Sequence, residues 1–286
     1  MDSSEAACGR IGTLPAVARR ELTEEEQAIF NAGERLIPGV SMGVAELVRH
    51  RSSYLFFRRA IEDDLALLDP RAPITVADLG CGVGHGCCTI AEAPGTHVVG
   101  FDNSRQTLDY ARRHYARPNV EYELADLAEL MPRLREYDYV VSRGALEHVP
   151  RGLDLVRSIR ARFRIMFDVP FGEAADANPH HQVHDVREDA FAGFADTELF
   201  FQDLWGTMYD RPHKPRRPNM IMSVMTRGVL PPLTSRLEFP IEPWRPAARR
   251  DELRLLLERA VVFGGMTKRR LSRAARRITP QAAAER

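Results

Sequence analysis

The chain has 286 residues, of which 44% are hydrophobic and 28% charged, and its formal net charge is zero. This profile is that of an ordinary globular protein, and the balanced charge argues against a general electrostatic attraction to nucleic acid or anionic membranes. No apolar run approaches the length of a membrane span and the first residues lack a signal-peptide pattern, so a cytoplasmic location is expected. The four cysteines fit neither a disulfide framework nor a C-x-x-C zinc pair.

Two helices are expected ahead of the first strand. A helical pattern covers residues 21–37, where Thr23 and Glu26 have the spacing of a capping box. A second amphipathic helix is predicted over 44–68, because apolar side chains recur there at helical spacing. Residues 1–70 are therefore expected to form a helical N-terminal unit.

An alternation of strands and helices follows, which is typical of a doubly wound sheet in an α/β protein. The connection at 211–218 is too rich in proline for regular structure. Helices are expected over 84–93, 104–116, 127–134, 151–161 and 187–194. Strands are expected at 74–79, 97–101, 119–124, 138–142 and 164–169, followed by an antiparallel pair at 198–203 and 219–225.

The segment from Val76 to Gly86 is the most informative part of the chain. An apolar strand runs into Asp78 and then into glycines at every second position from Gly80 onward. Glycines at such a turn permit positive φ and let a ligand approach the backbone. Neither the dinucleotide fingerprint G-x-G-x-x-G nor the phosphate loop fits this spacing. Asp78 would repel a phosphate but would suit a cationic ligand end, such as an ammonium or a sulfonium.

Further motifs follow at the ends of the next strands. Asp102 lies about 20 residues past the glycines, where ribose hydroxyls bind in such folds. Asp126 follows the third expected strand, and Ser142 and the segment 145–149 (A-L-E-H-V) follow the fourth. Over residues 74–226 these ordered motifs resemble those of class I S-adenosylmethionine-dependent methyltransferases of the small-molecule type.

The resemblance implies a seven-stranded, mostly parallel, Rossmann-like methyltransferase core at 71–227. It also implies N-terminal lid helices within 1–70 and a helical C-terminal extension at 228–286. The expected cofactor is S-adenosyl-L-methionine, with S-adenosyl-L-homocysteine as product. In relatives an Arg-Tyr pair of the lid often closes on the methionine moiety; here Ser53 precedes Tyr54, so only the tyrosine carries over. The predicted cofactor-binding residues are Tyr54, Asp78, Gly80, Cys81, Gly82, Asp102, Asn103, Asp126, Leu127 and Ser142.

Histidines supply the candidate catalytic groups. His148 directly follows the fourth strand, and its imidazole fits a general base, a pocket wall or a structural hydrogen bond. His181 and His184 lie in a loop at 178–185 and are candidates for catalysis or substrate binding, with loop hydrogen bonding as the alternative. No metal is expected: the loop setting disfavours a helical metal face, and Gly144 replaces the first Glu of the Glu-x-x-Glu-His arrangement that binds Mg²⁺ in some relatives.

The expected reaction is O-methylation of a small-molecule acceptor such as a sugar or another specialised metabolite, as in natural product biosynthesis. N-methylation stays open. An RNA methyltransferase is the alternative in another class, although the neutral charge and the lack of an Asn/Asp-Pro-Pro-Tyr motif argue against nucleic acid. A scaffold that holds the cofactor without catalysis is a third hypothesis. Helices are also expected at 251–262 and 268–278. The basic second one predicts a solvated tail, a contact in a homo-oligomer, or attachment to anionic lipid or RNA, and the N-terminal helices are a further candidate for a homo-oligomer contact.

Overall fold

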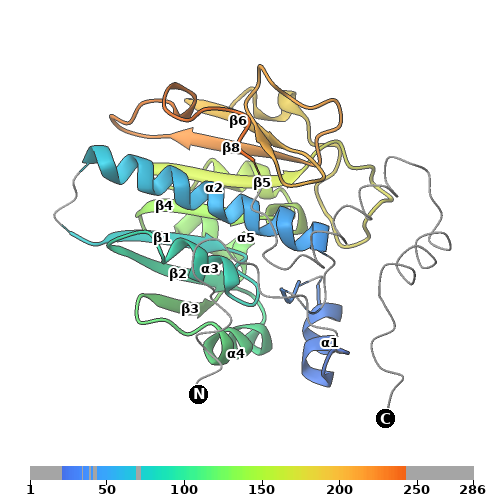
Figure 1. The fold of residues 1–286 in the computed structure, drawn as a ribbon. Helices are drawn as coiled ribbons and strands as arrows, with labels where there is room; N and C mark the ends of the chain where they lie inside the picture. Colours follow the sequence, from blue (N-terminus) through green and yellow to red (C-terminus); the bar gives the residue numbers. More distant parts are fainter. Residues whose placement is uncertain (1–20, 34, 39, 41–43, 69–71, 243–286) are drawn as a thin grey trace, which may run out of the picture.

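The computed structural model describes residues 21–33, 35–38, 40, 44–68 and 72–242, and the helices expected at 251–262 and 268–278 lie outside these residues. The strands are β1 (Ile74–Leu79), β2 (Thr96–Asp102), β3 (Val120–Leu124), β4 (Tyr137–Arg143), β5 (Ala161–Pro170), β6 (Thr197–Gln202), β7 (Met208–Tyr209) and β8 (Met220–Thr226). They form one sheet in the order β3-β2-β1-β4-β5-β8-β6-β7 (Figure 1). The first five strands pair in parallel, whereas β6, β7 and β8 pair antiparallel.

The predicted α/β fold class is confirmed, with one strand more than the seven expected. β7 contains only two residues, which pair with Phe201 and Gln202 of β6, so it is too short to leave an alternating pattern in the sequence. The closing antiparallel pair is confirmed as β6 and β8. No helix in the described part of the chain is both long and apolar enough to cross a membrane.

The helices differ from the expectation mainly in length. They are α1 (Glu24–Asn31), α2 (Val44–Leu68), α3 (His85–Ile90), α4 (Arg105–His114), α5 (Leu127–Leu130) and α6 (Gly152–Val156). The capping box at Thr23 and Glu26 is confirmed, but α1 ends at Asn31 rather than at residue 37. The helix expected at 151–161 shortens to α6 because β5 already begins at Ala161, and the one expected at 187–194 is a 3₁₀ turn, η3 (Glu188–Phe191).

Apolar side chains cover both faces of the parallel strands. One cluster joins residues of β1 and β2, such as Val76 and Val98, to Phe57 of α2 and Ile90 of α3. The other cluster packs the opposite face of the same strands against α5 and α6. α2 runs along the first face, across β4 and β5 (Figure 1). Burial on both faces explains why these strands read as nearly continuous apolar runs.

A buried ion pair attaches the C-terminal half of α2 to β5. Arg164 of β5 donates from Nε and Nη2 to the two carboxylate oxygens of Asp64, at 2.7 and 2.9 Å, and neither side chain is exposed to solvent. Tyr139 also donates to Asp64, at 3.3 Å, and Arg164 donates to Thr226 and to the backbone oxygen of Pro231. The guanidinium is thus satisfied on several sides, which a charge in an apolar interior requires.

Asp64→Ala is expected to lower the free energy of unfolding by about 3–5 kcal/mol, because it leaves the Arg164 guanidinium buried without a counter-charge. Urea denaturation measures this change. Asp154→Ala is the matched control: its ion pair with Arg151 is solvent-exposed, with side chains 57% and 81% accessible, so a change within about 0.5 kcal/mol is expected. Equal losses for the two variants would contradict the role given to the buried pair.

Candidate functional site

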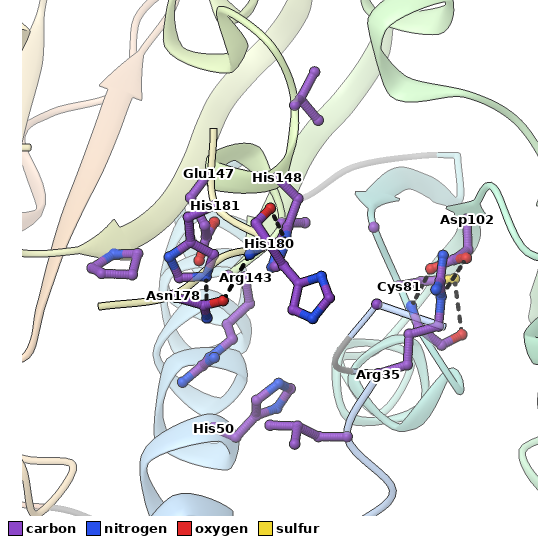
Figure 2. Close-up of a pocket in the computed structure, with 18 of the residues that line it drawn as sticks. Arg35, His50, Cys81, Asp102, Arg143, Glu147, His148, Asn178, His180 and His181 are labelled. Carbon is purple, nitrogen blue, oxygen red and sulfur yellow. Dashed lines mark hydrogen bonds and ion pairs between the residues drawn. The ribbon is translucent and has the colours of Figure 1, made fainter. Parts of the chain in front are cut away.

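The carboxyl ends of the parallel strands meet at one edge of the sheet, where a cavity of about 960 Å³ opens. Its lining comes from the segment after α1, the first half of α2 and the turn after β1. The ends of β2, β4 and β5, the loops after β2 to β5 and the start of β8 complete it. Two groups of residues lie at opposite ends of this cavity (Figure 2). We call them the glycine-loop half, made by Gly80, Cys81, Gly82, Asp102, Asn103, Asp126 and Leu127, and the histidine half, made by Arg143, Glu147, His148, His180 and His181.

The glycine loop leaves open space over its backbone. Gly80 and Gly82 have φ of +77° and +53°, values that side chains disfavour. A Cβ on Gly80 would lie 2.2 Å from the Cβ of Ala145, so the loop after β4 packs directly against this glycine. A Cβ on Gly82 would meet no atom within 4 Å. The sequence predicted that these glycines let a ligand approach the backbone closely. The open space above Gly82 is consistent with that prediction.

Asp102 is the central acid of the glycine-loop half. Its Oδ2 accepts from the backbone N–H of Gly82 at 3.2 Å, and its Oδ1 accepts from that of Ser104 at 2.9 Å. Arg35, from the segment after α1, donates to the same Oδ1 at 3.0 Å and also to the side chain of Asn103. The N-terminal segment therefore brings an arginine to this site, although Ser53 takes the place of the arginine expected before Tyr54.

Other predicted cofactor residues divide between the lining and the layer behind it. Asn103, Leu127 and Tyr54 line the cavity. Asp126 lines it too, and its side chain caps α5 by accepting from the N–H of Ala128 at 2.8 Å. Each of these side chains can contact a ligand.

Asp78 and Ser142 are absent from the lining. Asp78 is fully buried and accepts from Tyr54 at 3.4 Å and from the Cys87 thiol at 3.2 Å, while burial raises its pKa to about 7. Burial thus disfavours the charged form of this carboxyl. Ser142 donates to the backbone oxygen of Leu79 at 2.8 Å. Both residues hold the loops that form the cavity instead of facing it.

In the histidine half, a short 3₁₀ turn, η2 (Leu146–His148), presents His148 to the cavity. Nδ1 of His148 lies 3.2 Å from the backbone oxygen of His180. Because a carbonyl oxygen only accepts hydrogen bonds, Nδ1 carries the proton, and the lone pair of the neutral ring is on Nε2. The rings of His148 and His181 meet edge to face, 4.7 Å apart.

Glu147 holds the loop after β5 over this half. Its backbone oxygen accepts from the N–H groups of Gln182 and Val183, at 2.6 and 3.1 Å. Its carboxyl group is buried, which raises the pKa to about 8, and Oε2 has no hydrogen-bond partner among the described residues. Ligand atoms of Glu147, His148 and His181 all lie within 4.8 Å of one another, so this group could hold a metal ion. The expectation that no metal is required stays a prediction.

His184 is the predicted catalytic histidine that the structure does not bring into the cavity lining, although it lies only three residues after His181. His181 does line the cavity, and it is held by Glu173 at Nδ1 and by Asn178 at 3.0 Å from Nε2. The loop is irregular here, so sequence spacing did not indicate which histidine faces inward.

Arg35, His50 and Arg143 are lining residues to which the sequence patterns assigned no individual role. For Arg143 a signal existed, since a charged residue that ends a buried strand lies at the ligand-binding edge of a parallel sheet. His50 lies on α2, with Nδ1 2.9 Å from Nε2 of His85. The helical periodicity of the sequence does not distinguish a histidine that lines a cavity from one buried in the core.

Comparisons with known proteins find methyltransferases among those similar to this chain. The model of a methyltransferase domain matches residues 76–165. The trans-aconitate 2-methyltransferase of Mycolicibacterium gilvum is 33% identical over 46% of this chain and 51% of its own length. The ubiquinone biosynthesis O-methyltransferase of Neisseria meningitidis (serogroup A) is 34% identical over 38% of this chain and 47% of its own length. A solved structure of the CurJ carbon methyltransferase matches with a TM-score of 0.49 at 14% identity, over 65% of this chain and 55% of that chain.

The chain thus spans about half the length of the curated relatives that it matches. The matched segment, 76–165, contains the glycine loop, Asp102, Asp126 and the end of β4 with its following turn. Residues 76–165 therefore match a methyltransferase domain, and the chain is similar to S-adenosylmethionine-dependent methyltransferases.

Proposed function

We propose that the protein transfers the methyl group of S-adenosylmethionine to an oxygen atom of a small-molecule acceptor, such as a sugar or another specialised metabolite. The observation that carries this proposal is a single cavity that joins the glycine-loop half to the histidine half. The names of two relatives support an oxygen-directed or metabolite-directed reaction: one acts on trans-aconitate and the other is an O-methyltransferase of ubiquinone biosynthesis. N-methylation is the alternative that the same cavity would serve.

The residues of the glycine-loop half fit the cofactor. The space above Gly82 admits a ligand against the backbone, and Asp102 offers a carboxylate to ribose hydroxyls at the end of β2. Asp126 and Leu127 follow β3, where the family places the adenine. Arg35 would have to share or release Asp102 when a ribose binds, because it now donates to Oδ1. When bound, S-adenosylmethionine supplies an electrophilic methyl group on a sulfonium.

His148 is positioned to accept a proton. An acceptor hydroxyl loses its proton as its oxygen attacks the methyl carbon, and Nε2 of His148 carries the lone pair that would take it. The loop held by Glu147 covers this half, which helps to orient the acceptor and to exclude water. Holding two reactants in line supplies a large part of the acceleration in a displacement reaction.

Asp102→Ala is expected to weaken S-adenosyl-L-homocysteine binding about 10- to 100-fold, because it removes charge-assisted hydrogen bonds to the ribose. Isothermal titration calorimetry measures the affinity. Asp109→Ala serves as the control, since Asp109 is an exposed carboxylate on α4 that pairs with Arg112. Absence of binding by the wild-type protein, or full affinity in Asp102→Ala, would refute the assignment of the glycine-loop half.

His148→Ala is expected to lower kcat by roughly 10²-fold or more, because general-base catalysis typically contributes about 10²- to 10⁴-fold. The measurement uses the hydroxyl acceptor that a screen of hydroxylated metabolites identifies, and S-adenosyl-L-homocysteine affinity should change little. His213→Ala is the matched control, because His213 is an exposed histidine that pairs with Asp210. If His148→Ala keeps the wild-type kcat and raises only the acceptor KM, the residue binds substrate and is not the base.

A further inference from the structure

The histidine half contains one buried cation whose hydrogen-bonding capacity is not used. Arg143 ends β4 and lines the cavity, and its side chain is only 8% exposed. Its Nε has no hydrogen-bond partner among the described residues. Its ion-pair partner is Glu46 of α2, whose Oε1 lies 3.8 Å from Nη2, beyond hydrogen-bond distance. Burial of a guanidinium whose N–H groups lack acceptors costs free energy unless a ligand supplies those acceptors.

The neighbouring carboxylates do not account for Arg143. Glu46 already pairs with Arg49 through its other oxygen. Asp168 lies beside Arg143 in the sheet, but one of its oxygens accepts from a backbone N–H at 3.0 Å and the other from Ser53 at 2.5 Å. These acids therefore have other partners. Arg143 lines the cavity, where Figure 2 shows its side chain between His50 and the histidines of the loop after β5.

The remaining titratable groups near Arg143 leave it as a positive centre. Burial and the charge of Arg143 lower the pKa of His50 well below its ordinary value, and burial lowers the pKa of His85 to about 3, so both rings are neutral near pH 7.

We propose that Arg143 binds a carboxylate group of the methyl acceptor, so that the acceptor is an anionic small molecule; this inference rests on the proposed methyltransferase function. The planar guanidinium offers parallel N–H groups that match the two oxygens of a carboxylate. Phe171 and Met220 also line this part of the cavity and provide apolar surface for the carbon skeleton of such a molecule. A phosphate dianion fits less well, because Glu46 and Glu173 lie in the same lining and would repel a second negative charge.

Acceptor binding and proton removal are assigned to different residues. Arg143 comes from the last position of β4, whereas His148 comes from the turn that follows it. A carboxylate held by Arg143 would therefore anchor the acceptor at one point while another group of the same molecule faces His148. Arg143 acts in this scheme as a specificity-determining residue and takes no proton.

The experiment uses the full chain loaded with S-adenosyl-L-homocysteine and titrates it calorimetrically with matched pairs of probes: hexanoate and hexanamide, benzoate and benzamide, succinate and succinamide. We expect at least one carboxylate to bind about tenfold or more tightly than its amide. Arg143→Gln should abolish this preference, and Arg143→Lys should restore part of it, because an ammonium keeps the charge but loses the fork geometry. Arg133→Gln is the control for the loss of an arginine, since Arg133 is 71% exposed outside the cavity.

Equal binding of acid and amide in every pair, or a preference that persists in Arg143→Gln, would overturn the inference. Tighter, Arg143-dependent binding of phenylphosphonate than of benzoate would overturn the choice of carboxylate. The affinity for S-adenosyl-L-homocysteine is measured for each variant first. Its absence in the wild-type protein would refute the proposed function itself, whereas normal affinity without carboxylate preference would refute only the role of Arg143. Normal affinity in Arg143→Gln also shows that the variant is folded.

Discussion

The parallel pairing of β1 with β4 is the constraint on which the site depends. It places the turn after β1 against the turn after β4. The two turns are so close that a Cβ on Gly80 would clash with the Cβ of Ala145. The glycine loop therefore packs directly against the segment that carries Glu147 and His148. A ligand bound over Gly82 is in this way brought to the same cavity as the groups after β4. The contact is local, but it links the two halves of the site.

Helix α2 is fixed at two buried polar points along its length. Asp64, near its C-terminal end, is held by Arg164, and Ser53, near its middle, donates to Asp168 and accepts from Gln202. Since both anchors lie in the sheet, the N-terminal half of α2 is directed along the cavity, where it contributes Glu46, Arg49, His50 and Tyr54. A polar anchor in an apolar interface favours one register of the helix over its neighbours, because any shift leaves charges without partners.

Burial changes the charges that the cavity presents. Asp78 and Glu147 are acids by sequence, yet desolvation raises their pKa to about 7 and about 8. His50 and His85 are potential cations, yet the same effect keeps them neutral. Asp102 in the glycine-loop half and Arg143 in the histidine half both line the cavity, together with Arg35, Glu46 and Glu173. A formal count of charges, which is zero for the whole chain, does not show this distribution.

The fold class, the positions of the principal strands along the chain and the glycine turn could be predicted from the sequence, because they depend on periodicity and on local backbone freedom. The sequence also indicated Asp102, Asp126 and His148, since residues that end parallel strands must gather at one edge of the sheet. It did not determine that Asp78 and Ser142 lie behind the lining, or that His181 faces the cavity and His184 does not. It also assigned no individual role to Arg35, His50 and Arg143, which reach the cavity from three separate elements. Only the tertiary structure decided these points, because whether a side chain meets solvent, a partner or a ligand depends on packing between segments that are distant in the chain.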